Sequence, residues 1–98
     1  MIKENEIYVF KLNSGEELLA KVVGIATDYY TITNPVSIAP SQQGLGMVPS
    51  LFTADMDSEI RLNTSSISVS AVPAGEITVK YIEATTGLVV PEKKVILG

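Results

Sequence analysis

The chain has 98 residues, enough for one small domain, and its eleven acidic and seven basic residues give a net charge of −4. It contains neither cysteine nor histidine, which excludes disulfides, the commonest zinc ligands and the usual nucleophile–base pairs. The acidic balance argues against strong sequence-independent binding to nucleic acid, which needs clustered Lys and Arg.

The first 25 residues predict a β-hairpin. In EIYVFKL, residues 6–12, Ile7 and Val9 fall on one face and Tyr8, Phe10 and Leu12 on the other, and the β-branched and aromatic content favours a strand; ELLAKVVGI follows as a second strand at residues 17–25. The connection between them is short, and Gly15 supplies the positive φ that a tight turn needs. Gly24 predicts a bend or bulge within the second strand.

The middle of the chain predicts three further strands. Residues 30–40 form the third, and Pro35 within it should lie at a bulge or an edge because it cannot donate a ladder hydrogen bond. PSQQGLG, residues 40–46, is expected to be a loop. The fourth strand is expected within residues 47–63 and the fifth at 67–72, separated by a short polar corner. Five short strands with turns between them predict a small, strongly bent, antiparallel all-β barrel.

Residues 74–86 fit both a helix and a strand. Apolar side chains recur across them at helical spacing, but several also alternate as in a strand. Pro73 before the segment and Gly87 after it are typical of helix ends. We therefore predict a short C-terminal helix, followed at 88–98 by a short strand or an arm that packs on a neighbouring subunit.

Two motifs stand out in this order of elements. In VFKLNSGEELLAKVVGIATDYYTI, Leu12 and Gly15 precede an apolar strand and a turn with Asp28 and aromatic residues. IRLNTSSISV has a strand, a tight polar turn and a short strand that begins with Ile67. Together they resemble the two signatures of Sm-like proteins, the small bent barrels of Sm, LSm and Hfq proteins. The elements LNTSSI and TGLVVPEKK resemble most the small Sm-like proteins encoded by phages of marine cyanobacteria.

The resemblance implies one Sm-like domain over residues 1–98, with an SH3-like barrel at about 6–72 and the helix and tail at about 74–98. Sm-like subunits pair through their fourth and fifth strands, so a homo-oligomeric ring of about five to seven copies is expected. The implied function is single-stranded RNA binding without catalysis, cofactor or metal.

Sm-like proteins hold a uridine or adenine at the rim of the ring, between the turn after the second strand and the turn before the last. A tyrosine there can stack on a base, and Asn, Thr or Arg can read base edges or phosphate. Adjacent tyrosines in a strand point to opposite faces, so one of the pair is expected in the core. The RNA-binding positions that the resemblance implies are Asp28, Tyr29, Tyr30, Arg61, Asn63 and Thr64.

A second function stays open beside RNA binding. The Arg-Gly of Sm proteins and the Lys-His of Hfq are replaced here by Asn63-Thr64 or Thr64-Ser65. Short polar side chains in a tight turn also serve to satisfy backbone groups, and Arg61 can pair with a nearby acid. The alternative is a structural or assembly scaffold of the same fold that binds protein.

Catalysis and membrane association are not expected. The paired acids at residues 16–17 and at 55 and 57 lack the number and spacing of groups that a calcium site or an acid–base pair needs. No apolar run approaches the roughly 18 residues of a membrane helix, and the first residues lack the apolar core of a signal peptide. A cytoplasmic protein is expected, in the host cell if a phage encodes it.

Overall fold

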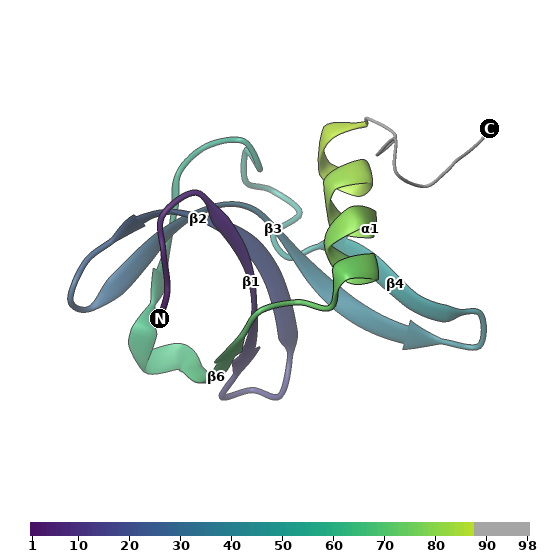
Figure 1. Ribbon diagram of the computed structural model, residues 1–98, viewed down its shortest axis with the longest axis horizontal. Coiled ribbons are helices and arrows are strands. Elements are labelled where there is room, and N and C mark those ends of the chain that lie inside the picture. Colours follow the sequence, from purple (N-terminus) through teal and green to yellow (C-terminus); the bar gives the residue numbers. More distant parts are fainter. Residues whose placement is uncertain (88–98) are drawn as a thin grey trace.

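A computed structural model describes residues 1–87, which form one antiparallel sheet followed by a helix (Figure 1). The sheet has six strands in the order β4-β3-β2-β1-β6, and β5 also pairs with β3. The predicted antiparallel β structure with a C-terminal helix is therefore confirmed. The elements are β1 (Glu6–Leu12), β2 (Glu17–Ile25), β3 (Tyr29–Ser41), β4 (Gly44–Pro49), β5 (Ile60–Asn63), the 3₁₀ turn η1 (Thr64–Ser66), β6 (Ile67–Ala71) and α1 (Gly75–Thr86).

The prediction of five strands and of a loop at residues 40–46 is wrong. β3 continues to Ser41 and β4 begins at Gly44, so only Gln42 and Gln43 connect them. Gly44 has a φ of +111°, a conformation that glycine adopts readily and that permits such a short connection. Residues 47–63 consequently contain the end of β4, a loop and β5, instead of one strand.

A bulge divides β3 into two halves with different partners. The pairing of β3 with β2 shifts register between Lys21↔Thr33 and Leu19↔Val36, around the buried Pro35. The prediction that this proline lies at a bulge is confirmed. The first half pairs with β5 and the second half with β4. In Figure 1 the second half and β4 extend away from the other strands as a two-stranded arm.

Strands β1 and β2 carry apolar side chains on both faces, so one apolar cluster packs on each face of the sheet. On the inner face the buried residues come only from strands: Tyr8, Phe10, Leu18, Ala20, Val22 and Ile32. On the outer face Leu19 and Val36 pack against Tyr81 of α1. The sheet is curved around the inner cluster, but β5 and β6 do not pair with each other within residues 1–87, so it does not close there.

Helix α1 ends as the sequence predicted. Gly87 adopts the left-handed conformation, with a φ of +74°, and its N–H donates to the Glu83 carbonyl at 3.0 Å. The packing of Tyr81 over β2 and β3 explains why this segment is helical although it contains several threonines, which are weak helix formers. The strand or arm expected at 88–98 lies outside the described residues.

Candidate functional site

The predicted RNA-binding residues meet where β3 begins and β5 ends. In the β3–β5 pairing, Tyr29 lies opposite Asn63 and Thr31 lies opposite Arg61. Asp28 immediately precedes β3, and Thr64 immediately follows β5. The antiparallel register thus brings two segments more than thirty residues apart into one place, which we call the corner.

The two adjacent tyrosines of the corner point to opposite faces of the sheet. The Tyr30 ring packs near the Phe10 ring, with centroids 5.9 Å apart, and belongs to the inner cluster. The Tyr29 ring is on the other side, where the guanidinium carbon of Arg61 lies 4.0 Å from its centroid. Tyr29 and Arg61 therefore lie on the face of the sheet that is available to a ligand, and Tyr30 packs on the opposite, inner face.

The Tyr29–Arg61 contact is a cation–π interaction between partly exposed side chains. Such contacts contribute about 0.5–1 kcal/mol at exposed sites, enough to bias two long side chains toward one geometry. A flat guanidinium on an aromatic ring also provides a plane on which a nucleic acid base can stack. Arg61, the only arginine of the chain, was expected to pair with an acid. The contact seen here is with a ring.

Part of the corner serves the backbone. The N–H and the hydroxyl of Thr64 both donate to the Asp28 carbonyl oxygen, at 3.0 and 3.1 Å. Asn13, in the β1–β2 turn, donates its side-chain amide to the Ser65 carbonyl at 2.7 Å and accepts a hydrogen bond from the Ser68 hydroxyl. These bonds attach η1 to two neighbouring turns and hold the corner in position.

Asn63 differs from its neighbours in the corner. It precedes η1 and is exposed, but its side chain makes no capping hydrogen bond. An amide has two donors and an acceptor oxygen, which suits it to read the edge of a base. Asn63 and the Tyr29–Arg61 pair thus stay accessible in the corner, and so does the exposed acidic side chain of Asp28.

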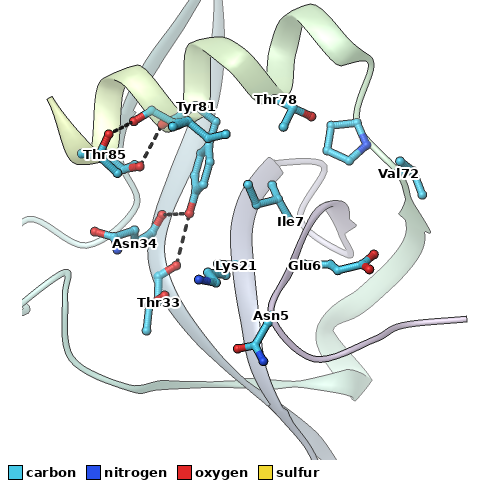
Figure 2. Close-up of a pocket in the computed structure, with 13 residues that line it drawn as sticks. Asn5, Glu6, Ile7, Lys21, Thr33, Asn34, Val72, Thr78, Tyr81 and Thr85 are labelled. Atoms are coloured by element: carbon cyan, nitrogen blue, oxygen red, sulfur yellow. Dashed lines mark hydrogen bonds between the residues drawn. The ribbon is translucent and has the colours of Figure 1, made fainter. Parts of the chain in front are cut away.

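A groove beneath α1 was not predicted from the sequence (Figure 2). It has a volume of about 600 Å³, within the range of ligand pockets. Apolar side chains of β1, α1 and the connection before α1 form part of its wall, and hydroxyl and amide side chains form the rest. Because five separate segments contribute to it, no local motif could have revealed it. Its charged residues are Glu6 and Lys21.

Tyr81 supports the groove from the helix side. Its hydroxyl lies 2.8 Å from the Asn34 carbonyl oxygen and 3.3 Å from that of Thr33, and Figure 2 shows both bonds. Burial raises the pKa of Tyr81 to about 12, partly offset by a hydrogen bond with the Lys21 backbone. The phenol therefore stays protonated near neutral pH and acts as a donor that fastens α1 to the bulge of β3.

Residues 1–87 hold no group of three or more acidic side chains arranged to bind a metal ion. Within the same residues, α1 is too short and too polar to cross a membrane. The sequence matches no protein-family model, and no curated protein is significantly similar to it.

Proposed function

We propose that this protein is a non-catalytic, Sm-like binding module that assembles into a ring and binds single-stranded RNA. The observation that carries the proposal is the corner. It holds an aromatic–guanidinium stack beside an exposed amide, and hydrogen bonds from η1 to both neighbouring turns fix it in place. Stacking surfaces combined with adaptable polar groups are what single-stranded RNA recognition uses.

The strand order supports an Sm-like barrel as the fold of the module. Without β4, the sheet runs β6-β1-β2-β3-β5, a five-stranded curved sheet whose two ends are joined by the 3₁₀ turn η1. The arm formed by β4 and the second half of β3 is then an extension of this barrel. The bulges at Gly24 and Pro35 supply the bending that a small barrel needs.

Two strand edges support assembly into a ring. Within residues 1–87, β5 pairs only with β3 and β6 pairs only with β1, so each has one edge without a partner strand. Such edges pair readily with another chain. Pairing of β5 with β6 of the next copy is a head-to-tail contact, which closes into a ring when the rotation between copies allows it.

A ring would compensate for a low affinity of each single corner for RNA. One corner offers one stacking surface and one arginine, so a single nucleotide is bound weakly. An RNA strand that visits several identical corners gains affinity from their proximity. Because each copy contributes so little positive charge, few phosphates are neutralised and the dependence of affinity on salt should be shallow.

The test is direct binding of labelled oligonucleotides, oligo-U and oligo-A, measured by fluorescence anisotropy at low and high salt. We expect a strand long enough to reach several corners to bind much more tightly than a strand of about three nucleotides. Absence of binding to both sequences at low salt would remove RNA from the proposed function.

A scaffold that binds protein is the second candidate. The observation in its favour is the segment 45–52, on which Leu45, Val48, Leu51 and Phe52 are all exposed. Exposed large apolar side chains that concentrate in one segment are candidates for contacts with protein. With a net charge of −4, the same ring would then serve as an assembly platform without nucleic acid.

A further inference from the structure

The inner cluster is open to the surface at one apolar recess. The recess has a volume of about 210 Å³ and lies between the β1–β2 turn, β5 and the start of the loop that follows β4. Glu16 and Arg61 also line it, and the Arg61 guanidinium itself lies over the Tyr29 ring, on the other face of the sheet. Its apolar lining is Leu12, Leu18, Ile32, Pro35, Ile60 and Leu62.

The size and lining of the recess suit one aromatic ring. A dry cavity of about 150 Å³ lined by Leu, Ile and Phe is large enough to bind benzene. The recess here is larger and similarly lined, but it is open on one side. An apolar centre with a polar margin, here Glu16 and Ser50, is also the usual pattern of a protein–protein contact.

The most exposed aromatic side chain of the molecule lies close to this recess in sequence. Phe52 is 84% exposed, whereas Phe10 is fully buried and the four tyrosines are buried or half-buried. Leu51, the residue before it, lines the recess of its own chain. Phe52 is therefore a large apolar side chain with most of its surface in water.

The loop that carries Phe52 is attached to the sheet at both ends. The Ser50 N–H donates to the Pro35 carbonyl at 3.1 Å, and the Ser37 and Ser50 hydroxyl oxygens lie 3.0 Å apart. Further along, the Met56 carbonyl accepts a hydrogen bond of 2.7 Å from the Asn34 N–H. Phe52 lies between these attachments, on a loop that is held at the bulge of β3.

We propose that the Phe52 side chain of one copy fills the apolar recess of the next copy. An exposed apolar side chain on one copy and a complementary recess on another make a contact that can repeat from copy to copy. Ile60 and Leu62 of the recess belong to β5, whose unpaired edge is the one proposed to pair with β6. The inference rests on the self-association in the proposed function and adds a specific contact to it.

Sedimentation velocity over a concentration series tests the contact, with Ile25→Ala as the matched control. Ile25 is also an exposed apolar residue, at 46%, but it does not line the recess. We expect Phe52→Ala to raise the concentration needed for half-assembly by about tenfold or more, and Ile25→Ala to leave it unchanged. The Phe52→Ala monomer should melt at the wild-type temperature, since the lost side chain is solvated.

Photo-crosslinking locates the contact independently. With p-benzoylphenylalanine at position 52, and isotopically heavy and light copies mixed, we expect heavy–light crosslinks to peptides that contain residues 12–18 or 60–62. Crosslinks confined to one copy, or wild-type assembly by Phe52→Ala, would overturn the contact while leaving the ring intact. A wild-type protein that stays monomeric at micromolar concentration would overturn both the contact and the ring.

Discussion

The two halves of β3 show how one strand can serve two purposes. Before the bulge, Tyr30 and Ile32 face the inner cluster, while Tyr29 lies on the other face with Arg61. After the bulge, the strand pairs with β4, takes part in the outer cluster under α1 and becomes exposed from Ala39 onward. The first half combines a buried face with a candidate ligand face, and the second half supports a helix and an arm.

This difference has a physical origin in the register shift. The bulge at Pro35 bends β3, so its two halves can accept different partner strands. The residues available for ligand chemistry lie in the half that pairs with the short strand β5. The predictions below test this division, first through stability and then through binding.

The largest effect is expected from the buried face of the first half. Ile32 is 2% exposed and packs in the inner cluster. Replacing it by Ala should lower the free energy of unfolding by about 2–5 kcal/mol, because it leaves a cavity among strands that are already paired. Urea denaturation measures the change. Thr31→Ala, one position away on the other face, is the control and should change the urea midpoint far less.

The ligand face of the same half should affect RNA binding and not stability. Tyr29→Ala removes the ring under Arg61 and should weaken oligonucleotide binding by about 1–3 kcal/mol, the range for loss of a stacking side chain. Arg61→Ala should weaken it less, since it uncovers the Tyr29 ring, on which a base can still stack. Both variants are first checked for wild-type assembly by light scattering. Wild-type affinity in Tyr29→Ala would refute the corner as an RNA site.

The first half of β3 was the more predictable one. The alternation around Tyr29–Tyr30 correctly indicated that only one of the two tyrosines is in the core. Among the apolar residues of the predicted strands, Leu18, Val22 and Ile32 are buried, and Leu12, Ile60 and Ile67 are half-buried against them. The candidate RNA-binding residues converge because register follows from local alternation and turn length, which a sequence displays.

The second half was less predictable because its signals conflict. Ser41, Gln42 and Gln43 have a loop composition, yet the strand continues to Ser41 and the turn takes only the two glutamines. The groove and the recess were missed for another reason. Each is lined by several distant segments, so their existence depends on tertiary packing and leaves no periodic trace in the sequence.

A substitution in the turn between β3 and β4 tests whether the arm unfolds together with the rest of the sheet. Gly44 has a φ of +111°, and a side chain added there would meet nothing within 4 Å. Gly44→Ala should therefore destabilise through backbone strain alone, by about 1–2 kcal/mol if the arm unfolds together with the sheet. Gly75→Ala, also without a close neighbour but with a negative φ at the start of α1, is the control and should be neutral or stabilising. If Gly44→Ala leaves the midpoint of urea unfolding unchanged, the arm is not part of the cooperative unit.

The smallest effect on stability is expected at the bulge between the two halves of β3. Tyr81→Phe removes the hydroxyl that donates to the Asn34 and Thr33 carbonyls but keeps the packed ring. The loss should be about 0.5–1.5 kcal/mol near neutral pH, the usual net contribution of one hydrogen bond. Tyr29→Phe is the control, because the role assigned to that residue depends on its ring and not on its hydroxyl.

The same hydroxyl predicts how stability depends on pH. The pKa of Tyr81 is raised from 10.0 to about 12, chiefly by burial, so above pH 10 the unfolded chain loses the phenolic proton before the folded protein does. Folding then requires that proton to be taken up again, and the free energy of unfolding falls as the pH rises from about 10 to about 12. Below pH 10 the phenol is protonated in both states, and its contribution is complete. By urea midpoints, the wild-type advantage over Tyr81→Phe at pH 8 should be lost or reversed at pH 11.5. A wild-type advantage that is as large at pH 11.5 as at pH 8 would mean that the Tyr81 hydroxyl ionises as readily in the folded protein as in the unfolded chain, and that α1 is not fastened to the β3 bulge through a buried phenol.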